Sequence, residues 1–229
     1  FGCTCSTLSD TISLATHAEG AGAFGIVLIV PPYIKPPQEA VFDFFKQVAE
    51  SVNLPIAIYN NPTRVGVNIS PELMVNLSKI ENIIADKEAI PDVSQLQEIQ
   101  NNTADDFSIL CCDYPGYSLI LPTLALGGAG TANVAGNIIP EEMEQLSRPW
   151  VSQDDAIQAK ELYFELLPLL KLLYSVSNPV PVKAAVNLLG FKVGNPRPPL
   201  PTFSGAKLTE LTNLLKNTNL SNLTERAII

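Results

Sequence analysis

Short apolar runs alternate regularly along this chain with longer segments that have the pattern of helices. The runs are Phe24–Val30, Pro55–Tyr59, Ile83–Asp86, Phe107–Cys112 and Gly130–Ala135. They begin roughly every 22 to 31 residues, which is the length of one strand–helix unit. The first run is apolar throughout, as expected for a strand that is covered on both faces. Successive units of this kind predict a parallel sheet with right-handed crossovers, either an open doubly wound sheet or a closed barrel.

The segments between and after these runs have the spacing and the end signals of helices. Residues 38–52 have apolar side chains at helical spacing, and Ser70, Pro71 and Glu72 form a typical helix start. Residues 60–69 are expected to be a loop, and Phe1 with Gly2 the end of a sixth strand. Further helices are expected at Val93–Ile99, Tyr117–Leu126, Pro140–Leu146, Asp154–Tyr174, Val180–Leu189 and Ala206–Lys216.

The composition excludes several classes of function. The 229 residues are 46% hydrophobic and 16% charged, which predicts a well-buried globular protein. A formal charge of −9 without any basic run argues against a nucleic acid or a membrane as partner. Cys3, Cys5, Cys111 and Cys112 lack the spacing of zinc or redox motifs, and the chain has one histidine. We therefore expect no metal, and read the cysteines as small buried side chains in a reducing cytoplasm.

Candidate functional residues follow from the rule that the sites of parallel α/β proteins lie at the carboxyl ends of the strands. No glycine-rich phosphate-binding motif follows any predicted strand, so we expect no nucleotide cofactor. The residues at these strand ends are Pro31–Tyr33, Tyr59 with residues 60–66, Lys87 with Glu88, Cys112 with Asp113, and Asn133.

Lys87 is the most informative of these residues because it ends an apolar strand. The neutral amine of a buried lysine can attack a carbonyl and form a Schiff base. The alternative is a lysine that extends to solvent or pairs with Asp86 or Glu88. Tyr59 ends another strand; its hydroxyl would relay protons if the two strands are neighbours, and otherwise the side chain serves packing. Arg64 either holds a substrate carboxylate or forms a surface ion pair.

Four segments resemble the dihydrodipicolinate synthase and N-acetylneuraminate lyase superfamily. Residues 59–66 resemble its Y-N-x-P-x-R-x-G segment, and residues 83–89 resemble the strand I-I-G-x-K-E-x that carries the Schiff-base lysine. Residues 126–130 and 178–183 match two further blocks in the expected order and spacing. The resemblance covers essentially the whole chain.

This resemblance implies a (β/α)8 TIM barrel with C-terminal helices, here with residues 1–150 as a partial barrel and 151–229 as the helical region. It implies a cytoplasmic homo-oligomer, a tetramer or dimer, that uses no cofactor. Pyruvate or a related 2-keto acid would form an imine on Lys87, and Tyr59 would carry protons. Arg64 would face a substrate carboxylate, and the backbone near Cys112 and Ala132 would border the pocket.

The chain departs from the family pattern in three respects. It begins near the third strand of the pattern, so we expect the first two β/α units, with their G-T-T-G-E loop, to be missing and the barrel to be open. Ile34 follows Tyr33, where synthases have a second tyrosine that reaches a neighbouring subunit's site. Cys112 stands where glycine is usual, and Ser6 where an inhibitor-binding asparagine is frequent.

Three functions remain open from the sequence. Arg64 favours a 4-hydroxy-tetrahydrodipicolinate synthase, whose aldehyde substrate carries a carboxylate. Ile34 favours a keto-deoxy-sugar-acid dehydratase or aldolase of the same superfamily. The third is a degenerate, non-catalytic paralogue that binds a keto acid or only assembles with partners.

Overall fold

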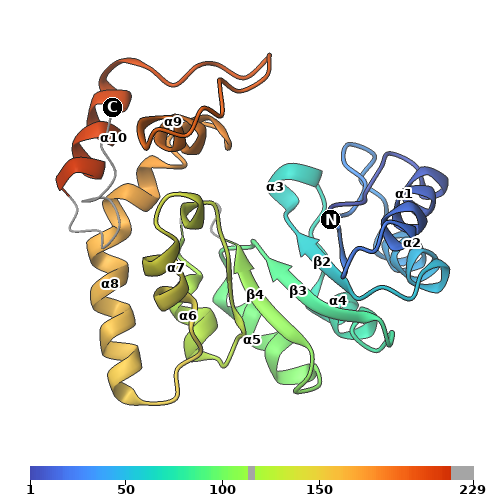
Figure 1. Ribbon diagram of the computed structural model, residues 1–229. Coiled ribbons are helices and arrows are strands. Elements are labelled where there is room, and N and C mark those ends of the chain that lie inside the picture. The colour runs from blue at the N-terminus through green and yellow to red at the C-terminus, as the bar shows by residue number, and fades with distance from the viewer. Residues whose placement is uncertain (113–116, 218–229) are drawn as a thin grey trace.

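The computed structural model describes residues 1–112 and 117–217, which contain a parallel sheet of five strands (Figure 1). Each strand pairs with the one before it in the chain, in the order β1 to β5. The strands are β1 (Ile26–Leu28), β2 (Ile56–Asn60), β3 (Ile83–Glu88), β4 (Ser108–Cys112) and β5 (Gly130–Ala132). Gly2 adds a parallel bridge to Val27 at the free edge of β1, where the sequence predicts the end of a further strand. The predicted parallel arrangement is confirmed.

Helices connect the strands and extend the chain beyond the sheet (Figure 1). Within the sheet region they are α1 (Leu8–Gly20), α2 (Gln38–Ser51), α3 (Pro62–Val65), α4 (Pro71–Leu77), α5 (Val93–Asn102) and α6 (Ile120–Ala125). A short 3-10 helix, η1 (Ala135–Asn137), and α7 (Pro140–Ser147) follow β5. The chain continues through α8 (Gln153–Leu172), α9 (Val180–Leu188) and α10 (Gly205–Asn217).

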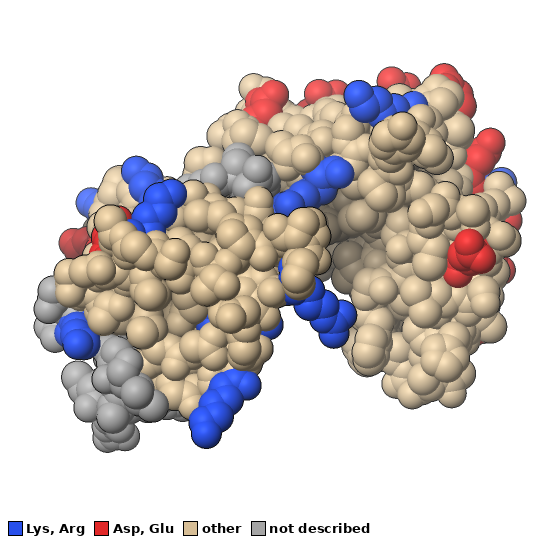
Figure 2. All heavy atoms as spheres, turned by 90° about the horizontal axis from the view of Figure 1, so that it is seen from above, with Lys and Arg blue, Asp and Glu red and all other residues tan. Residues whose placement is uncertain are grey.

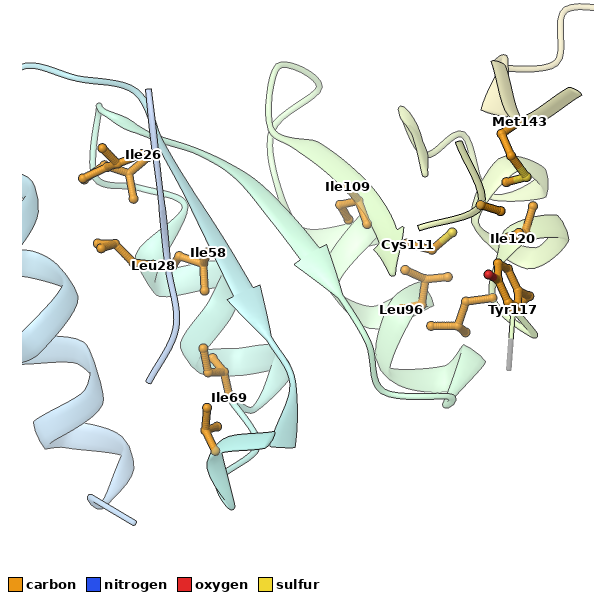
Figure 3. Close-up of a cluster of buried hydrophobic side chains, with 14 of the residues drawn as sticks. Ile26, Leu28, Ile58, Ile69, Leu96, Ile109, Cys111, Tyr117, Ile120 and Met143 are labelled. Carbon is orange, nitrogen blue, oxygen red and sulfur yellow. The ribbon is translucent and has the colours of Figure 1, made fainter. Parts of the chain in front are cut away.

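The two faces of the sheet differ in their surroundings. In β2 the side chains alternate between buried and half-buried, with Ile56, Ile58 and Asn60 buried against the helices. Tyr59 therefore points to the opposite, inner face, because successive side chains of a strand point to opposite sides. The buried residues continue along the helix-covered face of the neighbouring strands, where Figure 3 shows Ile26, Leu28 and Ile109 in the apolar core. The core thus holds the sheet from one side and leaves the inner face to the site.

Long α8 brings the C-terminal region back to the strand ends. Ser152 caps its first turn in a reciprocal capping box with Asp155, so the helix begins sharply after residue 152. Leu166, Leu169 and Leu170 are buried on its inward stripe. The turn that follows α8 and leads into α9 carries residues 173–179.

Several elements differ from the sequence-based expectation; the strand expected at Gly130–Ala135 ends at Ala132, and η1 begins at Ala135. Helix α1 was not predicted, because the side chains that it buries are small: Thr11, Ala15 and Ala18. The predicted loop 60–69 contains α3, a single turn that is too short to show a periodic pattern. Helix α6 begins at Ile120 rather than at residue 117, because Tyr117 has a left-handed backbone with a φ of 62°. Asp113 lies outside the described residues.

Candidate active site

Tyr59 and Lys87 lie side by side at the carboxyl ends of neighbouring strands. They are direct partners in the register of β2 with β3. This register includes a shift between Ile56 and Ala57, which places the two residues on the same inner face. The Lys87 Nζ atom lies 3.9 Å from the centroid of the Tyr59 ring. The strands that carry Tyr59 and Lys87 are therefore neighbours. This is the arrangement in which the Tyr59 hydroxyl is expected to relay protons.

The Tyr59 hydroxyl is held by two side chains. The Asn61 amide Nδ2 donates to it at 2.7 Å, and the Cys112 Sγ lies 3.1 Å away at the end of β4. The Asn61 Oδ1 in turn accepts a hydrogen bond from the Thr63 hydroxyl at 2.6 Å. Asn61 and Cys112 are almost fully buried. The phenol oxygen is thus contacted from both sides by buried side chains.

A buried polar network on the opposite face locks the same two strands together. The Asn60 Nδ2 donates to the Glu88 Oε2 at 3.0 Å, and the Gln95 Nε2 donates to the same oxygen at 2.9 Å. The backbone N–H of Ile90 donates to the Glu88 Oε1 at 2.7 Å. Burial raises the pKa of Glu88, and these hydrogen bonds oppose that rise. The network ties each strand end to the loop after it, and so fixes the height of Tyr59 relative to Lys87.

In the part of the chain that the structure describes, the carboxyl group of Asp86 is buried without a polar partner. Asp86 faces Ile58 across the sheet, its side chain is 0% exposed, and neither carboxyl oxygen has a hydrogen-bond partner among the described residues. Burial, and then the negative charge of Glu88, hold its pKa well above the usual range. Asp86 and Glu88 lie on the helix-covered face, so the ion pair with Lys87 that the sequence left open is not formed.

We expect Asp86 to make folding stability depend on pH. The carboxyl ionises near pH ~4 in the unfolded chain and at higher pH in the folded one. Between these two pKa values the folded state binds more protons, so the free energy of unfolding falls as the pH rises, by up to about 1.4 kcal/mol per pH unit. Asp86→Asn should flatten this dependence. Urea unfolding between about pH 5 and about pH 8 measures it.

The matched control for this experiment is Glu98→Gln, which makes the same chemical change at an exposed position of α5. It should leave the pH dependence as it is in the unmodified protein. An equal slope in the unmodified protein and in Asp86→Asn would show that Asp86 does not titrate in this range.

A pocket of about 530 Å³ opens above Lys87 and Tyr59. It is lined by Tyr59, Asn61, Arg64, Lys87, Ala132, Asn133, Val134, Tyr174 and Asn178. Seen from above, the molecule is hollowed between two lobes, with Lys and Arg side chains beside the hollow (Figure 2). A larger hollow of about 740 Å³ lies between α2 and α4, and none of the expected site residues lines it. The smaller pocket is the candidate site because its lining contains the Lys87 amine, the Tyr59 phenol and the Arg64 guanidinium.

The structure brings together most of the residues expected from the sequence. Tyr59, Lys87, Arg64 and Ala132 line the pocket, and Cys112 contacts it through Tyr59. Tyr33 is 93% exposed and is not part of this lining. Tyr174 and Asn178, from the turn after α8, were not predicted as site residues. The segment 178–183 was recognisable in the sequence, but only the fold shows that Asn178 reaches the pocket.

Two further observations concern the residues that the structure describes. None of their histidine, cysteine, aspartate and glutamate side chains form a group of three or more that could hold a metal ion. None of their helices is long and apolar enough to cross a membrane.

Comparison with known proteins decides the family. The model of the dihydrodipicolinate synthetase family matches residues 1–218. The chain belongs to this family. One relative is the 4-hydroxy-tetrahydrodipicolinate synthase from Methanococcoides burtonii, which is 38% identical over 91% of this chain and 70% of the relative. Another is the 4-hydroxy-tetrahydrodipicolinate synthase from Archaeoglobus fulgidus, which is 39% identical over 92% of this chain and 72% of the relative. The resemblance of the four sequence segments is thereby confirmed, and the chain is a homologue of a family of lyases.

Solved structures of the family share the fold. The enzyme from Cyanidioschyzon merolae with lysine bound superposes with a TM-score of 0.90 at 30% identity, over 96% of this chain and 73% of that one. Dihydrodipicolinate synthase from Thermotoga maritima gives a TM-score of 0.89 at 33% identity, over 96% of this chain and 74% of that one. The sheet and its helices therefore correspond to a large part of a TIM barrel of this family. The expected fold class is confirmed.

Proposed function

We propose that this chain carries the Schiff-base site of a 4-hydroxy-tetrahydrodipicolinate synthase, with Lys87 as the covalent residue. The observation that supports the proposal most is the pairing of Tyr59 with Lys87 at the floor of the pocket, with the amine 3.9 Å from the ring centroid. A nucleophilic amine and a phenol at this distance are the two groups that imine formation needs.

The reaction begins with attack of the neutral Lys87 amine on the C2 carbonyl of pyruvate. The carbonyl oxygen becomes a hydroxyl group, and it leaves as water when Tyr59 supplies a proton. The protonated imine then draws electrons from the adjacent methyl group, which loses a proton and becomes the nucleophilic carbon of an enamine. This carbon forms the new bond to the aldehyde of the second substrate, aspartate semialdehyde. Hydrolysis of the imine releases the product and restores the amine.

Arg64 is proposed to hold the carboxylate of the second substrate. Its side chain lines the pocket from α3, directly after the strand that carries Tyr59, and its planar guanidinium matches a carboxylate with two hydrogen bonds. Ala132 lines the pocket from β5, and Cys112, at the end of β4, contacts the Tyr59 hydroxyl. As for other members of the family, we expect the active form to be a cytoplasmic homo-oligomer.

A keto-deoxy-sugar-acid dehydratase or aldolase is the second candidate. It is favoured by Ile34, which carries no phenol and is exposed. A hydroxylated substrate brings hydroxyl groups of its own for proton transfer and has less need of that phenol. Both candidates share the imine on Lys87 and differ only in the second half of the reaction.

The test compares kcat/KM for condensation of pyruvate with aspartate semialdehyde and for turnover of a keto-deoxy sugar acid, because this ratio measures differential stabilisation of the transition state. We expect the condensation to be faster, and Arg64→Met to weaken it through a higher KM for the aldehyde. Arg148→Met is the matched control, since Arg148 pairs with Glu144 on the exposed side of α7. Faster turnover of the sugar acid would assign the chain to the second candidate.

A further inference from the structure

The hydroxyl of Tyr59 lies between two nearly inaccessible side chains from different parts of the fold. Asn61, which follows β2, is 1% exposed and donates to it at 2.7 Å. Cys112, the last residue of β4, is 2% exposed and has its sulfur 3.1 Å away. Each of these side chains presents a polar atom to the phenol, so neither serves packing alone.

The orientation of Asn61 determines the direction of these hydrogen bonds. Its Oδ1 accepts from the Thr63 hydroxyl at 2.6 Å, so its Nδ2 faces Tyr59. An amide nitrogen can only donate, and the phenol oxygen must therefore accept at this side. The proton of the phenol is left for another acceptor, and the Cys112 sulfur lies within reach. A thiol can also donate in the opposite direction.

We propose that Asn61 and Cys112 are positioning residues that hold the Tyr59 hydroxyl and stabilise its phenolate during imine formation. This inference rests on the proposed function of Lys87 and Tyr59. Asn61 stabilises the phenolate that forms when Tyr59 gives its proton to the departing water, because its N–H bonds more strongly to a charged oxygen. Cys112 stabilises the same state from the other side.

The protons balance within this group. The Cys112 thiol lies 3.1 Å from the phenol oxygen and can donate a hydrogen bond to the Tyr59 phenolate without giving up its proton. The phenolate then takes up the proton that the methyl group loses when the imine becomes an enamine. One proton leaves with the water oxygen and one returns, and no other acid or base is consumed.

The experiment compares three variants with the unmodified protein. Cys112→Ala should lower kcat roughly tenfold, the scale of one hydrogen bond lost in the transition state, with KM for pyruvate changed less than about twofold. Cys112→Ser should restore most of the loss, because a hydroxyl can also donate and accept. Asn61→Asp keeps the acceptor for Thr63, removes the donor to Tyr59 and adds a negative charge beside the phenol, so it should lower kcat by at least as much.

Cys111→Ala is the matched control. It removes the same thiol one residue earlier, on the helix-covered face of β4, where Cys111 lies in the apolar core beside Leu96 and Ile120 (Figure 3). Its kcat per folded molecule should equal that of the unmodified protein, even if the stability falls.

Reduction with borohydride in the presence of pyruvate separates the two proposals. If the unmodified protein forms an adduct on Lys87 and all variants form it at the same rate and with the same kcat, only the inference about Asn61 and Cys112 is overturned. Equal slowing in Cys112→Ala and Cys112→Ser would overturn it as well, since a role in packing would explain both. If the unmodified protein forms no adduct on Lys87, the proposed function fails first.

Discussion

Lys87→Met should abolish the covalent adduct that borohydride forms between this protein and pyruvate. In the unmodified protein the reduction should fix pyruvate on the peptide that contains Lys87, because borohydride converts the imine into a stable secondary amine. Methionine has a similar length and can keep the contact with the Tyr59 ring, but it has no nucleophile. Turnover should fall below detection with it, since the whole covalent route depends on this amine. Mass spectrometry of the digested protein measures the adduct.

The control for this result is Lys183→Met. Lys183 lies in α9, in one of the segments that resemble the family, and it lines a different hollow near residues 190–203. This variant should keep both the adduct and the activity. An adduct that persists in Lys87→Met would assign the chemistry to another lysine. The absence of any adduct with several 2-keto acids in the unmodified protein would favour the non-catalytic paralogue.

The placement of Tyr59 and Lys87 could be predicted from the sequence because it depends on local signals. Each residue ends an apolar run, and parallel strands present their carboxyl ends at one edge of the sheet. Their direct pairing could not be predicted. It depends on the register shift beside Ile56, and a shift of one residue would turn Lys87 into the helix-covered face. No residue type in β2 or β3 signals such a shift.

The surroundings of the phenol were less accessible to sequence analysis. Asn61 lies among the residues that the sequence identifies as functional candidates, at the end of a strand. Its contact with Tyr59 nevertheless depends on the side-chain orientation that the hydrogen bond from Thr63 fixes. Tyr174 and Asn178 reach the pocket only because α8 packs against α6 and α7 and runs back to the strand ends, and this long-range packing leaves no periodic signal in the sequence. Asp86 shows a related limit, since the sequence pattern gave no indication that a carboxyl group would be buried without a partner.

The second large effect is expected for Tyr59→Phe, which should lower kcat by ~10²-fold or more, the usual scale for a positioned proton carrier. Phenylalanine keeps the ring beneath the Lys87 amine, so the nucleophile stays in place and binding of pyruvate changes little. The proton donor for the departing water and the acceptor for the methyl proton are lost. Rapid mixing with pyruvate followed by borohydride should therefore show slow formation of the Lys87 adduct but the same final yield.

The stability of this variant follows from the neighbours of the phenol. The buried Asn61 amide loses its acceptor, which costs about 1–3 kcal/mol, so we expect a modest decrease in the free energy of unfolding and an intact fold. Tyr163→Phe is the control, because it removes the hydroxyl of a half-buried tyrosine in α8, where Tyr163 packs against Phe164. It should leave kcat unchanged. An unchanged kcat in a folded Tyr59→Phe protein would show that the proton comes from another group. Tyr59 would then contribute only the contact of its ring with Lys87.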